Sequence, residues 1–243
     1  MHAYGQFCPV AQACSVLGER WTVLIVRELL CGSTRFSELQ RGISRISPTM
    51  LAARLKELEA AGLVVRRGRG GRAATYHLTP IGRELEPIVF AIGAWGLRWT
   101  KGRIADEELD VELLMTDIGR RIDAAGLPDG RTVLRFRFTD VAEFSEWWLL
   151  IEGGAVDVCI DDPGEESDLS FVTTVRVLAE VWMGRRPLAD ALSTRDLRVS
   201  GEGVLKRSLS RWFVLHPYAR AVVVGRDAGG DGEAAGVSVG SAD

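Results

Sequence analysis

The sequence contains few of the residues that build catalytic and metal centres. Histidine occurs only three times in 243 residues, and His2, His77 and His216 lie far apart in the sequence. Residues distant in sequence can meet in a fold, but these three show neither a Ser-His-Asp pattern nor the spacing of metal ligands. We therefore predict that the chain is not an enzyme and binds neither a metal nor another cofactor.

Cysteine and long apolar runs are also scarce. The four cysteines lack the spacing of zinc ligands and of a disulfide framework. No apolar run approaches the roughly 20 residues that span a bilayer, and no signal-peptide pattern opens the chain. We therefore expect a cytoplasmic protein that does not associate with membranes.

Acidic and basic residues are present in nearly equal numbers, but they are unevenly distributed. Residues 1–103 contain 15 Lys and Arg against 7 Asp and Glu, a net charge of +8, whereas the remainder has a net charge of −11. Such an asymmetry indicates a nucleic-acid-binding module fused to a second domain. We expect a first domain over residues 1–103, a second over 104–226, and a disordered tail, rich in Gly, Ala, Ser and Asp, over 227–243.

Residues 47–62 have the pattern of a DNA-recognition helix. Ser47 can cap the helix, Pro48 suits its first turn, and Gly62 suits the left-handed residue after its end. Small and polar side chains oppose an apolar stripe, which is what a helix needs in order to enter a major groove. The stripe consists of Leu51, Leu55 and Leu58.

A basic β-hairpin is predicted directly after this helix. Two short strand-like runs, 63–67 and 73–78, flank a Gly-rich turn whose glycines let the backbone approach another surface closely. A helix followed by a basic hairpin is the order of a winged helix, and the alternative is an ordinary hairpin with solvated arginines. The arginines of this hairpin are Arg66, Arg67, Arg69 and Arg72.

Seven sequence blocks occur in order between residues 7 and 100. They are CPV at 8–10, LGERWT at 17–22, RFSEL at 35–39, ISPTML at 46–51, RLKELEAAGLV at 54–64, YHLTPIG at 76–82 and WG at 95–96. In order and spacing they resemble the HxlR family of bacterial transcriptional regulators. The resemblance implies a homodimeric winged helix that binds double-stranded operator DNA and represses or activates nearby genes.

We assign hypothetical roles in DNA binding to individual side chains of this module. Residues of the recognition helix would approach base edges, and Arg54 is best suited to read a guanine through two hydrogen bonds. Other basic residues would contact phosphates or the adjacent minor groove, and two-fold symmetry predicts a pseudo-palindromic operator with half-sites roughly 34 Å apart. The base-edge set is Ser47, Thr49, Met50, Ala53 and Arg54, the phosphate set is Lys56, Arg66, Arg67, Arg69 and Arg72, and Arg35 is a further DNA-contact candidate.

A second apolar stripe follows the hairpin at helical spacing. It is larger than one small winged helix easily buries, so we expect a helix-to-helix contact between two copies of the chain. In the alternative, the stripe packs only on its own domain or on the second domain. It consists of Ile81, Leu85, Ile88, Val89, Ile92, Trp95 and Trp99.

Cys8 has two interpretations. It precedes Pro9 at the start of a helix expected over 9–17, where the helix dipole favours a thiolate. The resemblance implies that a cysteine at this place can sense oxidants or electrophiles, which makes Cys8 a redox candidate. In the alternative, Cys8 is a small buried hydrophobe. Cys14, on the apolar side of the same helix, is expected in the core.

The second half of the chain predicts an α+β domain. A helix is expected over 105–122, strands over 132–138, 147–152, 155–160, 169–173 and 197–200, and helical patterns over 175–183, continuing apolar to 192, and 204–213. Gly153-Gly154 should form a tight hairpin between the second and third strands. The fold class of the whole chain is therefore α+β, with a winged helix-turn-helix followed by an antiparallel sheet under helices.

Four features of this half resemble the sterol-carrier-protein-like fold. They are the alternating strand before residues 161–163, the strand-into-helix over 169–183, the turn at 184–188 and the segment 197–201. The resemblance covers about residues 106–220 and implies an apolar tunnel for a hydrophobic small molecule. The candidate lining residues, each of which could equally be plain core, are Trp147, Trp148, Leu150, Val158, Phe171, Val175, Leu178 and Trp182.

Two functions from different classes agree with these patterns. The first, which the recognition helix and the basic hairpin favour, is a transcriptional regulator modulated by a hydrophobic effector. The second is a carrier of hydrophobic ligands that docks to nucleic acid through its basic domain. If the second domain has a closed core and serves only dimerisation, Cys8 becomes the better candidate for signal input.

Overall fold

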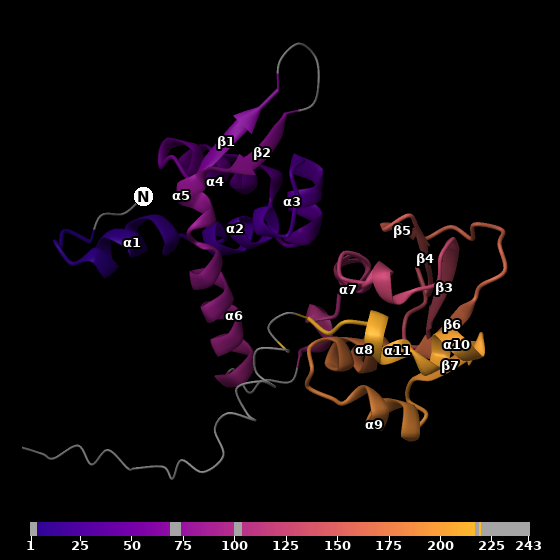
Figure 1. The fold of residues 1–243 in the computed structure, drawn as a ribbon. Coiled ribbons are helices and arrows are strands. Elements are labelled where there is room, and N and C mark those ends of the chain that lie inside the picture. Colours follow the sequence, from indigo (N-terminus) through magenta and orange to yellow (C-terminus); the bar gives the residue numbers. More distant parts are fainter. Residues whose placement is uncertain (1–3, 69–73, 100–103, 217–218, 220–243) are drawn as a thin grey trace, which may run out of the picture. The chain divides into compact units, whose positions relative to one another are not determined.

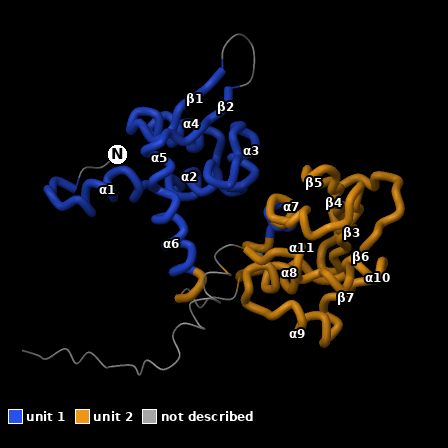
Figure 2. Tube along the Cα trace, in the orientation of Figure 1, with its two compact units in different colours: residues 1–96, 110–117 blue, residues 97–109, 118–243 orange. Residues whose placement is uncertain are grey.

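A computed structural model of the chain shows two compact units (Figure 2). Unit 1 comprises residues 1–96 and 110–117, and unit 2 comprises residues 97–109 and 118–243. The structure describes residues 4–68, 74–99, 104–216 and 219. The tail expected over residues 227–243 lies outside these described residues.

In the described part of unit 1, a two-stranded hairpin follows four helices and precedes further helices (Figure 1). β1 and β2 pair antiparallel, from Val64 opposite Leu78 to Arg67 opposite Thr75. This order matches the winged helix-turn-helix that the sequence predicted. The elements are α1 (Pro9–Leu17), α2 (Thr22–Leu30), α3 (Phe36–Gly42), α4 (Pro48–Ala60), β1 (Val64–Arg67), β2 (Thr75–Leu78), α5 (Pro80–Arg83) and α6 (Glu86–Trp99).

The core of unit 1 joins the apolar faces of α2, α3 and α4. Ile25 of α2 and Leu39 of α3 are fully buried, and the predicted stripe of Leu51, Leu55 and Leu58 on α4 is at most 2% exposed. Burying one such side chain stabilises the fold by about 1.5–3 kcal/mol. The stripe therefore determines which face of α4 packs inward, and the opposite face must point to solvent.

Unit 2 is an α+β fold built on a five-stranded sheet with the order β5-β4-β3-β6-β7. β3 and β6 are parallel, and the other neighbouring strands are antiparallel. The elements are a 3-10 turn (Asp106–Glu108), a second 3-10 turn (Ala124–Gly126), β3 (Arg131–Phe138), β4 (Glu146–Glu152), β5 (Ala155–Cys159), β6 (Leu169–Thr173), α8 (Val175–Trp182), α9 (Leu188–Ser193), β7 (Arg198–Gly201), α10 (Gly203–Arg207) and α11 (Leu209–Trp212). The helix α7 (Val111–Gly119) belongs mostly to unit 1, which includes residues 110–117.

The expectation of a purely antiparallel sheet was wrong. The β4–β5 hairpin forms as predicted, with Gly153 at φ +57° and Gly154 at φ +83°, the left-handed values that glycine adopts at low cost. After β5 the chain crosses to the far side of β3 and enters β6 in the same direction as β3. Strand pattern alone does not distinguish this crossover from another hairpin, because parallel and antiparallel pairing place the same apolar residues inward.

Three predicted helical stretches are each interrupted: the stripe from Ile81 to Trp99, the helix over 105–122 and the helix over 204–213. Pro87 has no N–H and restricts the residue before it, so one helix ends at Arg83 and α6 starts at Glu86. The Oδ1 atom of Asp110 accepts a hydrogen bond of 3.0 Å from the N–H of Leu113 and begins α7 anew. Ser208 Oγ donates to the carbonyl of Val204 at 3.1 Å, where α10 gives way to α11.

Helices cover one face of the sheet in unit 2. The strand register places Phe136, Trp147 and Phe171 side by side on this face. The rings of Phe136 and Phe171 stack with centroids 4.4 Å apart, and Trp212 of α11 meets Phe171 edge-on at 6.3 Å. Aromatic contacts of this kind add about 0.5–1.5 kcal/mol each to the energy of burial, so this layer is the core of unit 2.

Candidate nucleic-acid interface

The two ends of α4 are formed by the residues that the sequence predicted. Ser47 is the N-cap, and its Oγ accepts a hydrogen bond of 3.2 Å from the N–H of Met50, with Pro48 as the first helical residue. Gly62 follows the helix at φ +72°, in the left-handed region that favours glycine. The caps set the length of α4, and its first turn stays exposed.

One face of α4 carries small and polar side chains that point to solvent. Thr49, Met50, Ala53 and Lys56 are all exposed, opposite the buried leucines. Together with the exposed Ser47, these residues form what we call the recognition surface. Lys56 makes no ion pair within the described part of the chain. A surface of this composition fits the edge of a DNA major groove, where small side chains allow close approach.

Arg54 does not belong to this surface, contrary to the expectation that it is free to read a guanine. Its side chain is only 14% exposed, and its Nη2 donates to Glu19 Oε2 at 2.9 Å. The Nη1 atom donates to Glu57 Oε2 at 2.5 Å, and the Nε atom donates to the carbonyl of Arg20 at 3.2 Å. A guanidinium held by three acceptors cannot present its fork to a base without first breaking these contacts.

The hairpin of β1 and β2 presents two of the predicted arginines. Arg66 and Arg67 are exposed, and within the residues that the structure describes neither one forms an ion pair. Arg69 and Arg72, at the expected tip, lie outside the described residues. Free, exposed guanidinium groups beside a recognition helix are suited to phosphate oxygens.

Hydrogen bonds anchor this hairpin to the helices of unit 1. The N–H of Tyr76 donates to the carbonyl of Thr34 at 2.7 Å, next to the start of α3. Thr79 Oγ1 donates to the carbonyl of Gly62 at 2.7 Å, at the end of α4. The base of the hairpin is therefore bonded to unit 1 near both α3 and α4.

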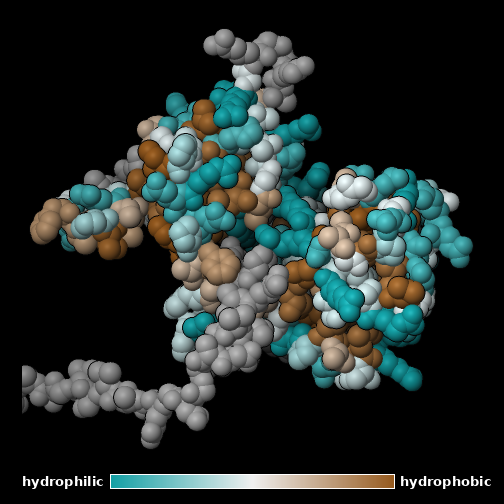
Figure 3. All heavy atoms as spheres, viewed as in Figure 1, coloured by the Kyte–Doolittle hydropathy of each residue, from teal (hydrophilic) through white to brown (hydrophobic). Residues whose placement is uncertain are grey.

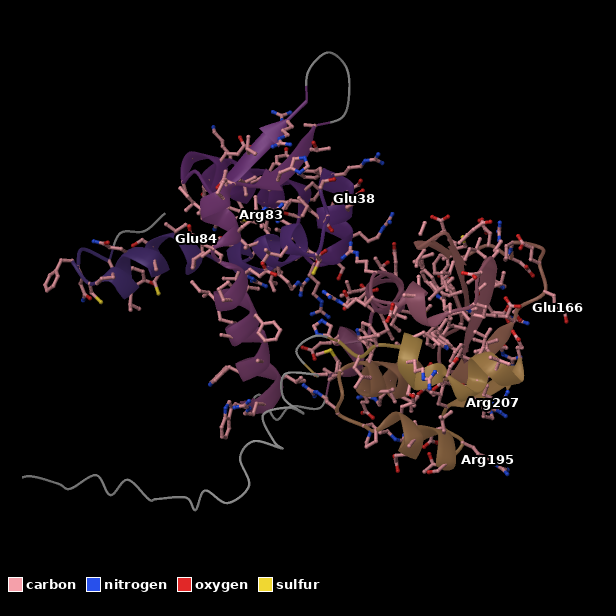
Figure 4. The ribbon with its side chains drawn as sticks, viewed as in Figure 1. Glu38, Arg83, Glu84, Glu166, Arg195 and Arg207 are labelled. Carbon is pink, nitrogen blue, oxygen red and sulfur yellow. The ribbon has the colours of Figure 1, made fainter. Side chains whose placement is uncertain are left out.

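Arg35 lies where the chain enters α3, beside the base of the hairpin. Its backbone forms an isolated bridge with Thr75, while its side chain is 68% exposed. The carboxylate of Glu38, which Figure 4 marks on α3, caps this helix by accepting hydrogen bonds from the N–H groups of Thr34 and Arg35 at 2.8 and 2.9 Å. The backbone of Arg35 is thus fixed, and its guanidinium can still reach a phosphate.

A buried carboxylate between α2 and α3 is a feature that the sequence did not reveal. Glu28 is only 3% exposed, and it accepts hydrogen bonds from Arg27 Nη2 at 2.8 Å and from Ser33 Oγ at 3.1 Å. Arg27 Nη2 also donates to the carbonyl of Gly42 at 2.9 Å. This cluster ties α2 to the end of α3, and no periodic pattern in the sequence distinguishes Glu28 from a solvated glutamate.

The eight residues predicted to line a tunnel in unit 2 do not all share one face of the sheet. Side chains alternate along a strand, so Trp148 and Leu150, which pair with Arg135 and Val133, lie on the face opposite Trp147. The other six belong to the helix-covered face of the sheet or to α8, and their side chains are buried or partly buried. They are Trp147, Val158, Phe171, Val175, Leu178 and Trp182.

The cysteines of α1 differ from their expected places. Cys8 is the N-cap of α1 and is partly exposed, so the interpretation of a fully buried hydrophobe does not hold. Cys14 is exposed rather than in the core. No residue of α1 is fully buried in the described structure, although Val16 of this helix is partly buried against the core of unit 1. The sequence pattern showed an apolar side but not what it meets.

Apolar side chains remain exposed on α6 and near α1. Val89 is buried and Leu85 partly buried against unit 1, but the rest of the predicted stripe faces solvent. Figure 3 shows apolar side chains at the surface over α1. Exposed fractions are 63% for Ile81, 46% for Ile88, 49% for Ile92, 62% for Trp95 and 58% for Trp99, with 95% for Phe7 and 69% for Val10 near α1.

The described residues contain neither a membrane-spanning helix nor a cluster of metal-binding side chains. None of the helices that the structure describes is long and apolar enough to cross a bilayer. Within the same residues, no three His, Cys, Asp or Glu side chains are grouped so that they could hold a metal ion.

Comparisons with known proteins agree with this geometry. Residues 16–103 match a family model described as HxlR-like helix-turn-helix. YvaP, an uncharacterised HTH-type transcriptional regulator of Bacillus subtilis, is 39% identical over 97 residues, which cover 39% of this chain and 90% of YvaP. An uncharacterised HTH-type transcriptional regulator of Mycobacterium tuberculosis is 32% identical over 127 residues, which cover 47% of this chain and 80% of that protein.

A solved structure was also matched. The reduced form of the transcriptional regulator YodB from B. subtilis is 36% identical, with a TM-score of 0.35, and the match covers 40% of this chain and 97% of YodB. The family model and the curated relatives decide the assignment, since YvaP is matched over nearly its whole length. The chain therefore belongs to the HxlR-like helix-turn-helix family of transcriptional regulators.

Proposed function

We propose that the protein binds operator DNA as a homodimer, with α4 in the major groove and the β1–β2 hairpin on the adjacent backbone. The observation that carries this proposal is the contrast between the two faces of α4. Its leucine stripe is at most 2% exposed, whereas Thr49, Met50, Ala53 and Lys56 all face solvent. Among the described residues of unit 1, no element buries these four side chains, and their composition suits base edges.

Charge supports the same arrangement. Residues 1–103 have a net charge of +8, and Lys56, Arg66 and Arg67 are exposed without ion pairs among the described residues. Each phosphate neutralised by such a group releases counterions, so the logarithm of the binding constant falls with the logarithm of salt by about 0.9 per contact. Base contacts then select the sequence, and phosphate contacts fix the register.

The dimer rests on the exposed apolar side chains of α1 and α6. Large apolar groups such as Trp95 and Phe7, at 62% and 95% exposed, favour burial against another surface. A second copy of the chain offers the same surface, as a two-fold interface requires. Two recognition helices related in this way fit a pseudo-palindromic operator with half-sites roughly 34 Å apart.

The proposal is tested by selecting genomic fragments with the purified full-length protein. Binding to the selected fragments is then measured by fluorescence polarisation over a range of salt concentrations. We expect a palindromic consensus, nanomolar-range affinity and a steep salt dependence. Lys206→Ala, an exposed basic residue of unit 2, is the matched control and should bind as the wild type does. Weak binding without a consensus would support the carrier function instead.

For regulation, we propose that unit 2 responds to a hydrophobic small molecule, as its resemblance to sterol-carrier-like domains implies. The site would be the aromatic layer between the sheet and α8 and α11. Phe171 and Trp182 are at most 2% exposed there, and both contact neighbouring rings. A ligand must therefore displace side chains in order to enter. Native mass spectrometry of the purified protein tests this, and a closed core would show no bound lipid.

As an alternative, we propose that the protein senses oxidants or electrophiles through Cys8. It lies at the N-terminus of α1 and is partly exposed, so a reagent can reach it. Thiol titration of the native protein with Cys8→Ser as the control tests the idea. A reaction of Cys8 that proceeds only in denaturant would rule it out, while a fast reaction that changes operator affinity would support it.

A further inference from the structure

The turn between α1 and α2 has an unusual backbone conformation. Trp21, the N-cap of α2, adopts φ +79°, a left-handed value that is unfavourable for a residue with a bulky side chain. The guanidinium of Arg20 lies 4.5 Å from the centre of the Trp21 ring, in the geometry of a cation–π contact. Such a conformation persists only where surrounding contacts hold it.

Arg54 of α4 supplies contacts of that kind. Its Nε donates to the carbonyl of Arg20 at 3.2 Å, and its Nη2 donates to Glu19 Oε2 at 2.9 Å. Both acceptors belong to the turn, and 35 positions separate Glu19 from Arg54. With side chains 14% and 19% exposed, the ion pair is shielded from water, so it is screened less by salt than a surface pair. The planar guanidinium also fixes direction, which a lysine ammonium does not.

The contact between Arg54 and the α1–α2 turn connects the recognition helix to the end of α1. Arg54 lies on the helix whose neighbouring positions, Ala53 and Lys56, belong to the recognition surface. The turn on the other side of the contact directly follows α1, which ends at Leu17. A change in the position of α1 would therefore be transmitted through Glu19 to the recognition helix.

We infer that Arg54 is a positioning residue: its guanidinium clamps the recognition helix to the α1–α2 turn through Glu19 and the Arg20 carbonyl. The clamp sets the direction in which α4 enters the groove, and Arg54 reads no base. This inference rests on the proposed DNA-binding function. The inference implies that Glu19 affects operator affinity although it does not touch DNA. It also implies that Arg54 does not read a base.

The experiment compares substitutions on both sides of the clamp in the full-length protein, using the selected operator and an unrelated duplex. Arg54→Gln and Glu19→Gln should each weaken operator binding by about tenfold, which corresponds to about 1.4 kcal/mol. Base preference within the operator should stay as in the wild type, and the salt slope should also stay unchanged because no phosphate contact is lost. The exchanged pair, Glu19→Arg with Arg54→Glu, should recover part of the lost affinity.

Glu57→Gln is the matched control. Glu57 also contacts Arg54, but it lies three residues away on the same helix and does not reach the turn. Its substitution should change operator affinity little. Melting temperatures of all variants are measured in parallel, and Arg54→Lys replaces Arg54→Gln if the latter fails to fold. A purely structural role would lower the melting temperature and weaken binding to both duplexes equally, and that outcome would overturn the inference.

Base reading by Arg54 gives a different result. In that case Arg54→Gln relaxes the preference at one base pair, while Glu19→Gln binds as the wild type does. That pattern would overturn the inference and leave the proposed function standing. A wild-type protein that selects no operator would overturn both.

Discussion

At the residue scale, burial determines which charged side chains contribute to the stability of the fold. Glu28 and Glu84 are both glutamates of unit 1, yet Glu28 is 3% exposed whereas Glu84 faces solvent (Figure 4). Glu28 holds two donors, and the structure leaves no room for a side chain at Gly42, where an added Cβ would lie 2.0 Å from a Glu28 carboxylate oxygen. The Glu28 carboxylate can therefore occupy its position only because residue 42 has no side chain.

This dependence gives a prediction for stability. Glu28→Ala should lower the free energy of unfolding by about 1–3 kcal/mol, because it leaves the hydroxyl of Ser33 and the guanidinium of Arg27 without this acceptor. Gly42→Ala should lower it by about 1–3 kcal/mol through overpacking. In the double variant the clash is gone, so the combined loss should be smaller than the sum of the two. Urea unfolding measures all three, with Glu84→Ala as the control, and strict additivity would contradict the proposed contact.

At the scale of elements, the proposed DNA binding assigns different roles to α4 and to the hairpin. The exposed face of α4 carries neutral side chains apart from Lys56, and the hairpin carries Arg66 and Arg67. Neutral side chains in a groove distinguish bases, whereas free arginines attract phosphates of any sequence. Specificity should therefore depend on α4, and the salt dependence on the hairpin.

The hairpin arginines supply the second prediction. Arg66→Ala and Arg67→Ala should each weaken binding to operator and to unrelated DNA by a similar factor. Each should also reduce the slope of log K against log salt by about one unit, because one phosphate contact is lost. Fluorescence polarisation between low and moderate salt measures both quantities. An altered base preference with an unchanged slope would show that these side chains read bases instead.

The segment around α9 shows electrostatics of another kind. Arg186 donates to Asp190 at 2.6 Å and to Asp196 at 2.7 Å, joining the two ends of this helical segment. The Arg186 guanidinium, with help from Thr194, holds the pKa of the Asp196 carboxyl below its usual range. A carboxyl whose pKa is lower in the folded state adds stability above its unfolded pKa of about 3.9 and loses it as pH falls through the folded value.

The third prediction follows from this sign. In Arg186→Gln, the pKa of Asp196 should rise toward its ordinary value, because the strongest donor to its ionised form is removed. An NMR titration of the side-chain carboxyl between pH 2 and pH 6 (a range set by the ordinary carboxyl pKa of about 4) measures the change. An identical titration curve in wild type and variant would show that Arg186 does not control this group.

At the scale of the whole molecule, exposed apolar surface indicates self-association. Trp95 and Ile88 of α6 are 62% and 46% exposed, and α1 has no buried residue in the described structure. Neither helix is expected to remain uncovered in water, because burying such side chains on both partners is favourable. In the proposed dimer, the operator would contact two recognition helices in place of one, which would raise the affinity and require a symmetric site.

The fourth prediction concerns this interface. Trp95→Lys should convert a dimer to a monomer in sedimentation velocity, since it places a charge in the apolar contact. Its far-UV circular dichroism should match the wild type, because Trp95 is exposed in the monomer and supports no core. Ile160→Lys, an equally large change at a 47% exposed position of unit 2, is the control and should remain dimeric. A dimer that survives Trp95→Lys would place the interface elsewhere.

Features that depend on local chemistry could be predicted from the order of the residues. The caps of α4 at Ser47 and Gly62, its inward leucine stripe, the order of helix and hairpin, and the Gly153-Gly154 turn follow from backbone preferences and from burial with a fixed period. These signals extend over a few residues and need no distant partner. The blocks that match the family belong to the same class of information.

Contacts between residues that are distant in the chain became visible only in the folded protein. Glu19 and Arg54 are 35 positions apart, so a helical pattern that placed Arg54 beside the recognition surface had no means to predict their ion pair. The same holds for the buried Glu28 and for the parallel pairing of β3 and β6. Periodicity says which residues prefer to be buried, but the partner that buries or binds each one is chosen by how the elements pack.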